Sequence, residues 1–170
     1  MPRLFVLILL LSTPCAFAGA GHAAHVHGAA SLDVAIDGNT LGIDLDTPAD
    51  NLLGFEHAPR SAADKQQASR VAALLAQPDK LFRINPEARC SADKPQLQAP
   101  ILSGAAAAGE HNDIEASYGF HCANPAALAN LDVLLFDAFP RLNSIKLQLA
   151  GPKGQRGMTL QQGRRSISLK

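Results

Sequence analysis

Two stretches of alternating apolar and polar residues, joined by a turn, constrain the fold of this chain more than any other feature. Leu32, Val34 and Ile36 alternate with polar or small residues, and the same pattern returns from Leu41 to Asp46. Between the stretches lies Asp37-Gly38-Asn39, a sequence typical of a tight turn. Because successive side chains of a strand point to opposite faces, the pattern predicts a β-hairpin with one buried and one solvent-facing side.

The rest of the chain adds more strands and only short helices. Alternation from Ile114 to Cys122 and from Ile145 to Leu149 predicts two further strands. Capping-box spacing at Ser61 and an apolar stripe of helical period predict a helix that begins near Ser61 and stops at Pro78. Short strands are expected at 81–84, 97–101, 158–160 and 167–169, and a short helix is expected to start at Asn124-Pro125, whereas 131–136 fits either a strand or a helix. The pattern therefore predicts an α+β fold, a single domain with an antiparallel-rich sheet and a few short helices.

The first eighteen residues have the pattern of an export signal. Arg3 precedes an apolar run over residues 4–11, and Ala16-Phe17-Ala18 matches a signal-peptidase cleavage pattern. We expect residues 1–18 to be removed and residues 19–170 to form the domain, with a flexible small-residue segment near 103–110. The apolar run is short for a bilayer and no later segment resembles a membrane span, so the exported chain is not expected to cross a membrane.

Composition argues against several classes of function. The chain has 15 Lys and Arg against 15 Asp and Glu, without a basic cluster and with few aromatic residues. Binding to nucleic acid or to an acidic membrane surface requires a basic patch, so neither is expected. The sequence also lacks the common metalloprotease, nucleophile-elbow, phosphate-loop and Cys-x-x-Cys motifs. We therefore do not expect an enzyme.

Two cysteines are expected to remain after export. Cys15 lies inside the predicted signal, which leaves Cys90 and Cys122. An even pair of cysteines in an exported protein favours a disulfide, because the compartment is oxidising. Closing this loop would stabilise the fold by about 3–4 kcal/mol in the chain-entropy account. The alternative is a metal-binding or reactive thiol.

Histidines near the predicted cleavage point supply candidate metal ligands. His22, His25 and His27 lie within ten residues of that point, and imidazole is a common ligand of transition metals. If the first strand ran on unbroken toward the N-terminus, His25 and His27 would share the solvent-facing side that carries Ser31 and Asp33. The alternative is a disordered polar N-terminus.

Two later groups could also contribute ligands. Glu56 and His57 are adjacent on the loop that precedes the predicted helix, where His57 could alternatively hydrogen-bond to backbone. A second group gathers before and along the strand that ends at Cys122, where the alternative is an ordinary solvated strand face; its members are Glu110, His111, Asp113, Glu115 and His121. His121 and Cys122 are neighbours in sequence, but strand alternation places them on opposite faces.

Several longer motifs resemble a known family. These are 25–35 (HVHGAASLDVA), 51–59 (NLLGFEHAP), 115–128 (EASYGFHCANPAAL) and 131–140 (LDVLLFDAFP). Together they resemble the ZrgA-type periplasmic zinc-uptake proteins over nearly the whole mature chain. The resemblance implies a Gram-negative periplasmic protein that binds zinc (Zn²⁺) and assists a zinc importer of the envelope.

The resemblance also implies particular ligands. Carried over by position, these are His25, His27, Glu56 and His57, with His22 and His111 as additional candidates. Many members carry a long His/Asp/Glu-rich insertion where this chain has mostly small residues over 103–111. If that insertion captures metal, low zinc stoichiometry is expected here. The alternative function is a structural or protein-interaction module of the cell envelope that binds no metal and docks a partner on the polar faces of the sheet.

Overall fold

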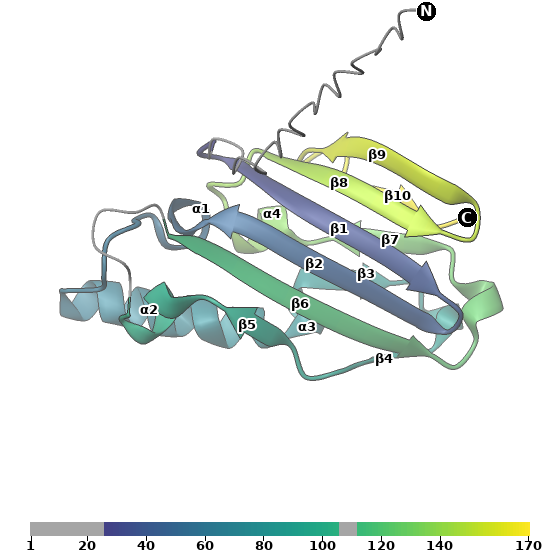
Figure 1. Ribbon diagram of the computed structural model, residues 1–170, viewed down its shortest axis with the longest axis horizontal. Helices are drawn as coiled ribbons and strands as arrows, with labels where there is room; N and C mark the ends of the chain where they lie inside the picture. Colours follow the sequence, from purple (N-terminus) through teal and green to yellow (C-terminus); the bar gives the residue numbers. More distant parts are fainter. Residues whose placement is uncertain (1–25, 106–111) are drawn as a thin grey trace, which may run out of the picture.

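The computed structural model describes residues 26–105 and 112–170. The predicted signal peptide, His22, His25, Glu110 and His111 lie outside these residues, as does most of the segment expected to be flexible. Within the described residues a seven-stranded sheet has the order β4-β6-β2-β1-β8-β9, with β5 also paired to β6, and a smaller sheet has the order β10-β7-β3 (Figure 1). The predicted α+β, antiparallel-rich fold is confirmed.

The elements follow one another along the chain with short connections. The large sheet contains β1 (Ala29–Asp37), β2 (Thr40–Pro48), β4 (Cys90–Ala92), β5 (Gln96–Gln98), β6 (Asp113–Cys122), β8 (Ser144–Gly151) and β9 (Gly154–Leu160). The small sheet contains β3 (Phe82–Ile84), β7 (Asn130–Val133) and β10 (Ser166–Ser168). The helices are α1 (Ala49–Leu53), α2 (Ala62–Leu75), α3 (Pro78–Leu81) and α4 (Leu135–Ala138), with 3₁₀ turns at Pro86–Ala88, Pro100–Ser103 and Pro125–Ala127. None of the helices in the described ranges is long and apolar enough to cross a membrane.

The predicted hairpin is present as β1 and β2. Asp37 pairs with Thr40 across the turn, where Gly38 has a φ of +59°. This left-handed conformation is accessible to glycine without the steric penalty of a side chain. Leu32 and Ile43 on the inner face are 0% and 1% exposed, whereas the aspartates of the outer face are exposed.

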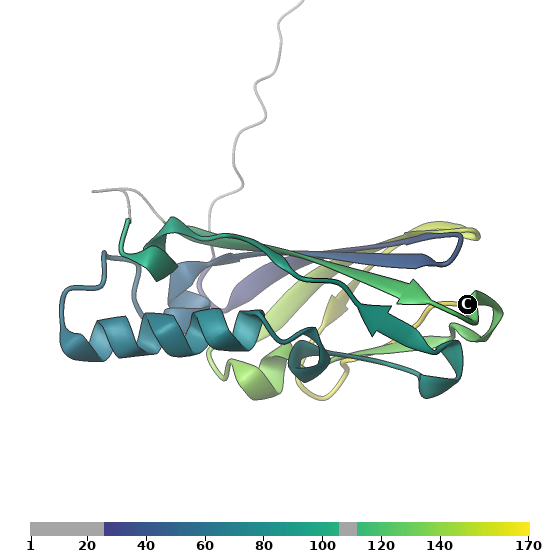
Figure 2. The same cartoon turned by 90° about the horizontal axis from the view of Figure 1, so that it is seen from below.

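One pairing in the large sheet is parallel. Ala29 is opposite Ser144 and Ala35 opposite Ala150, so β1 and β8 run in the same direction. A parallel neighbour requires a crossover connection, which here contains the helices and most of the small sheet. Figure 2 shows the large sheet nearly edge-on, with α2, α4 and the small sheet on one side of it. The hydrophobic core therefore lies between the two sheets and the helices.

The predicted helix after Ser61 is α2, and its start is capped as expected. The Asp64 amide donates to the Ser61 side chain at 3.0 Å, and the Asp64 carboxylate accepts from the Ser61 amide at 3.0 Å. These hydrogen bonds, led by the one from the Ser61 backbone, lower the pKa of Asp64. Ala68, Val71 and Leu75 form the buried side of the helix.

The structure resolves one expectation for a short element that the sequence left open, and another needs correction. The ambiguous segment 131–136 contains both structures, because β7 ends at Val133 and α4 begins at Leu135. The strand expected over 97–101 is only β5, since Pro100 lacks a backbone donor and begins a 3₁₀ turn instead.

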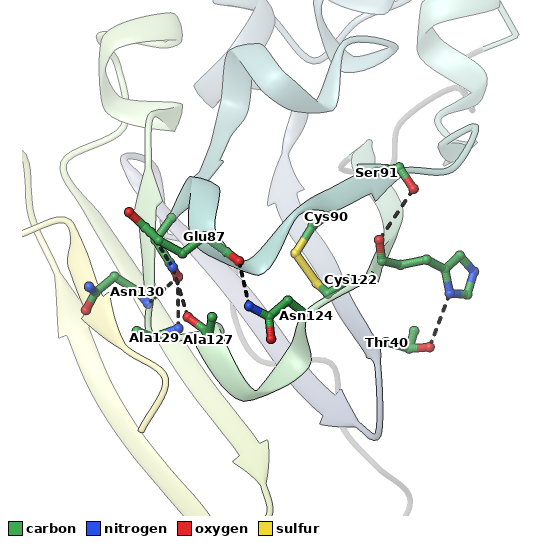
Figure 3. The surroundings of a disulfide bond; sticks show 11 residues. Thr40, Glu87, Cys90, Ser91, Cys122, Asn124, Ala127, Ala129 and Asn130 are labelled. Atoms are coloured by element: carbon green, nitrogen blue, oxygen red, sulfur yellow. Dashed lines mark hydrogen bonds between the residues drawn. A yellow bond between two sulfur atoms is a disulfide. The ribbon is translucent and has the colours of Figure 1, made fainter.

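The predicted disulfide joins Cys90 to Cys122 (Figure 3). The two residues lie directly opposite each other on β4 and β6, so the bond fastens a three-residue edge strand to the sheet. Hydrogen bonds continue this fastening beyond the strands, from the Ala123 amide to the Arg89 carbonyl at 3.1 Å and from the Asn124 amide to the Ala88 carbonyl at 2.9 Å.

Candidate metal centre

A turn, and not an extension of the first strand, positions His27. The Ala29 amide donates to the Val26 carbonyl at 3.0 Å, and Gly28 has a φ of +82°. β1 therefore begins at Ala29, so the strand does not run on unbroken and the condition under which His27 would share its solvent-facing side is not met. The physical reason is the left-handed backbone at Gly28, which breaks the period of two.

The buried side chain of Asn51 holds this turn in place. Asn51 is 1% exposed, accepts a hydrogen bond from the Gly28 amide at 2.6 Å, and donates to the Ala29 carbonyl at 2.8 Å and to the Thr47 hydroxyl at 2.9 Å. A Cβ atom on Gly28 would lie 2.4 Å from Nδ2 of Asn143, so only glycine fits without a shift. The start of β1, the end of β2 and α1 are thus tied together next to His27.

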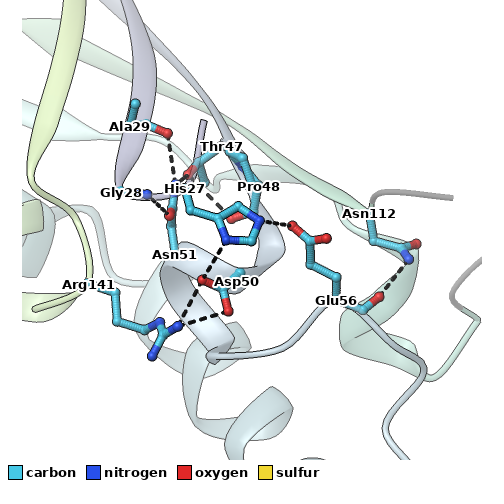
Figure 4. Close-up of polar contacts among 10 residues, drawn as sticks. All are labelled: His27, Gly28, Ala29, Thr47, Pro48, Asp50, Asn51, Glu56, Asn112 and Arg141. Atoms are coloured by element: carbon cyan, nitrogen blue, oxygen red, sulfur yellow. Dashed lines mark hydrogen bonds and ion pairs between the residues drawn. The ribbon is translucent and has the colours of Figure 1, made fainter. Parts of the chain in front are cut away.

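His27 lies between two carboxylates (Figure 4). Its Nε2 atom is 3.4 Å from Oε1 of Glu56, and its Nδ1 atom is 3.8 Å from Oδ2 of Asp50. The imidazole is 62% exposed, whereas the side chains of Glu56 and Asp50 are 20% and 13% exposed. An accessible ring thus faces a shielded carboxylate on each of its two nitrogens.

Both carboxylates are placed by long-range contacts. Asp50 lies in the first turn of α1, and Nη2 of Arg141 donates to its two oxygens at 3.0 and 2.9 Å. The backbone carbonyl of Glu56 accepts from the side chain of Asn112 at 2.8 Å, which links the Glu56 loop to the residue before β6. Arg141 and Asn112 thus connect distant parts of the chain to the surroundings of His27.

The other predicted site residue of this loop, His57, is placed differently. Its ring stacks on Phe55 with centroids 4.9 Å apart, and Nδ1 lies 3.0 Å from the Ala58 carbonyl. This is the local backbone contact weighed as the alternative. Among the residues that the structure describes, no interaction joins the ring of His57 to His27.

The described part of the third candidate group is spread along β6 and does not converge. Asp113 and His121 are eight residues apart, which is about 27 Å along an extended strand. His121 instead pairs with Asp93 at 3.3 Å and approaches the Thr40 hydroxyl at 3.5 Å. Its exposed ring and the buried Cys122 point to opposite faces, as the alternation predicts.

The geometry around His27 can be compared with what zinc requires. Zinc bonds to nitrogen and oxygen are about 2.1 Å long, so two ligands at the tetrahedral angle lie about 3.4 Å apart. The separation of His27 Nε2 and Glu56 Oε1 is 3.4 Å. Within residues 26–105 and 112–170, however, no group of three or more His, Cys, Asp or Glu side chains could hold a metal ion. The described residues thus offer two candidate ligand atoms at a suitable distance and not a complete site.

One protein family matches residues 24–169, most of the chain, and its description is ZrgA family zinc uptake protein. The chain belongs to the ZrgA family. A comparison with curated proteins finds no match. The ZrgA match begins at residue 24, so it includes His25 and His27 but not His22.

Sequence reasoning missed two residues of this ZrgA family member that lie beside His27. Asp50 directly precedes the Asn51–Pro59 motif, and an acidic residue in a first helical turn is a recognisable signal, but of helix capping and not of contact with His27. Arg141 directly follows the 131–140 motif. Its pairing with Asp50 spans 91 residues, a distance over which local periodicity carries no information.

Proposed function

We propose that this chain is a periplasmic zinc-binding accessory protein that assists zinc uptake by an envelope importer and is not an enzyme. Membership of a zinc uptake family supports the role in zinc transport. The signal-like N-terminus supports export. The observation that carries the assignment of the site is the 3.4 Å separation of His27 Nε2 and Glu56 Oε1.

Zinc would bind between Nε2 of His27 and the carboxylate of Glu56. Because zinc usually takes four ligands, the remaining positions would be filled from the preceding chain, by His25 or His22, or by water. His57 and His111 remain candidate ligands of lower rank. A site with only a few protein ligands suits a protein that passes its metal on, since an open position allows exchange.

A second histidine–carboxylate pair has to be weighed against this site. His121 and Asp93 are 3.3 Å apart, but their side chains are 56% and 53% exposed, and the other ring nitrogen faces a hydroxyl. His27 has two shielded carboxylates and two further histidines within five residues before it. We therefore assign zinc to His27 and use His121 as the matched control.

Isothermal titration of residues 19–170 with zinc at pH 7.5 tests the proposal. We expect binding of about one equivalent, weakened at least about tenfold by His27→Gln and by Glu56→Gln, because each removes one ligand. His121→Gln should leave the affinity unchanged. An affinity of the wild type no tighter than about millimolar would refute the function, since this corresponds to only about 4 kcal/mol. If zinc binding is lost in His121→Gln but kept in His27→Gln and Glu56→Gln, the site is at His121 and not at His27.

One observation favours the alternative of an interaction module. On the outer face of the large sheet Asp33 lies opposite Asp44, and Asp46 opposite Glu115. Like charges directly opposite each other destabilise a sheet, and a basic partner would relieve this repulsion. On this view a partner captured from envelope extract stays bound when chelator is added and is lost when Asp44 and Asp46 are replaced by Asn. Release of every partner by chelator would exclude the interaction-module function.

A further inference from the structure

The ring of His27 presents its two nitrogens to two different carboxylates. Nε2 faces Glu56 at 3.4 Å and Nδ1 faces Asp50 at 3.8 Å (Figure 4). A neutral imidazole carries a proton on one nitrogen and offers a lone pair only on the other. Zinc can therefore bind on one side of the ring, and the opposite nitrogen must then donate a hydrogen bond.

Asp50 is poorly suited to be the ligand on its side. Both of its oxygens lie within 3.0 Å of Nη2 of Arg141, whose guanidinium is permanently charged. A zinc ion on Asp50 would have to displace this contact and would be held next to a positive charge. The same contact makes Asp50 a good acceptor, because Arg141 holds its carboxylate in a fixed position.

We propose that Asp50, held by Arg141, accepts the proton on Nδ1 of His27 and so directs zinc to Nε2 on the Glu56 side. The inference rests on the function proposed above and adds two positioning residues to it. A carboxylate behind a metal-bound histidine fixes the ring and raises its basicity. The Nδ1–Oδ2 distance of 3.8 Å must shorten by about 1 Å to form this hydrogen bond, a shift open to an exposed ring in a turn.

The wild-type protein allows a direct test. The chain, with its ring nitrogens isotopically labelled, is loaded with a spin-active cadmium isotope as a zinc substitute and studied by NMR. We expect scalar coupling between cadmium and Nε2 of His27 and a proton retained on Nδ1. Coupling to Nδ1 would overturn the proposal without the need for any variant.

A pair of variants tests the role of the carboxylate. Asp50→Asn keeps the size of the side chain and removes its charge, so we expect zinc affinity to fall about tenfold or more and coupling to appear at both ring nitrogens. Asp132→Asn is the matched control, since Asp132 also pairs with an arginine, Arg83, at 3.9 Å, but on the small sheet. Its affinity should stay within about twofold of the wild type.

The possible failures can be told apart. If the wild type binds neither zinc nor cadmium, the proposed function fails and this inference fails with it. If the wild type binds through Nε2 and Asp50→Asn binds equally tightly through the same atom, only the role of Asp50 is refuted.

Discussion

Asn51 shows how a single side chain can decide the position of a site. A buried amide is costly unless its donors and acceptor are all used, and Asn51 uses its oxygen once and its nitrogen twice. All three partners lie where β1 begins and β2 ends, so the turn that contains His27 is built against a fixed point. The candidate ligand His27 is exposed, but the residue that places its turn, Asn51, is in the core.

Some features of single residues could be read from the sequence, and others could not. Strand alternation correctly places Cys122 in the core and His121 in solvent, since a period of two needs only neighbouring residues. The contacts of His27 with Asp50 and Glu56 depend instead on how a turn meets a later loop. No local pattern encodes that encounter, so His27 and Glu56 were grouped as candidate ligands only through the family resemblance, and the contact with Asp50 was not predicted.

Tyr118 provides a test of burial at the level of one residue. It is the only tyrosine, it is 2% exposed, and its hydroxyl has no hydrogen-bond partner among the described residues. Burial disfavours the phenolate and raises the pKa of Tyr118. The folded protein thus favours the neutral phenol over the phenolate. The contribution of neutral Tyr118 to the folding stability is present below the ordinary tyrosine pKa of about 10 and is lost as the pH rises further.

We expect tyrosinate absorbance to appear only with unfolding, above about pH 10. Circular dichroism followed in the same titration should change together with the absorbance. Tyr118→Phe keeps the edge contact with Phe82 and removes the unpartnered hydroxyl. The free energy of unfolding, measured in urea, should therefore be unchanged or higher by up to about 1 kcal/mol. Ionisation near pH 10 in a folded protein would contradict the burial of this hydroxyl.

Among the elements, local ones were predictable and long-range pairings were not. The β1–β2 hairpin and the capped start of α2 are encoded within a few residues, and both are present as expected. The parallel pairing of β1 with β8 joins segments more than a hundred residues apart. Strand propensity describes a segment but not its partner, which explains why the order of the sheet did not follow from the sequence.

The disulfide predicts a separation between stability and zinc binding. Cys90 and Cys122 are 32 residues apart, and loss of their bond should lower the free energy of unfolding by about 3–4 kcal/mol at most. We therefore expect Cys90→Ala/Cys122→Ala to unfold at a clearly lower urea concentration, while its zinc affinity stays within about twofold. Reduced wild-type protein serves as a second measurement of the same loss. Equal stability of the oxidised and reduced proteins would contradict this role.

At the scale of the whole molecule, the candidate zinc site at His27 and the Cys90–Cys122 disulfide lie at opposite ends of the large sheet. The Glu56 loop contacts Asn112 just before β6 begins, and the disulfide is at the last residue of β6. The strand between them has ten residues, or about 30 Å. This distance is the structural reason to expect that either feature can be removed without loss of the other.

The pH dependence of zinc affinity would show how many histidines of the chain are zinc ligands. Zinc binds neutral imidazole, which ordinarily takes up a proton near pH 6.5, so affinity should fall below about pH 6. The loss approaches tenfold per pH unit for each imidazole ligand. Titrations between pH 5 and 6 should give a slope near one if His27 acts alone and near two if His25 or His22 joins it.

His27→Gln is the control for this titration and should remove one unit of the slope. An affinity that does not change between pH 5 and 7 would contradict zinc ligation by an imidazole of ordinary basicity.

The anchoring of Gly28 by Asn51 has a practical consequence for the laboratory. His27 directly precedes the anchored Gly28 and is only a few residues from the expected start of the exported chain, so an N-terminal polyhistidine tag would add competing imidazoles near the proposed site. The C-terminus emerges at the other end of the large sheet from α1 (Figure 1). Purification handles therefore belong at Lys170, or should be cleaved off before any zinc measurement.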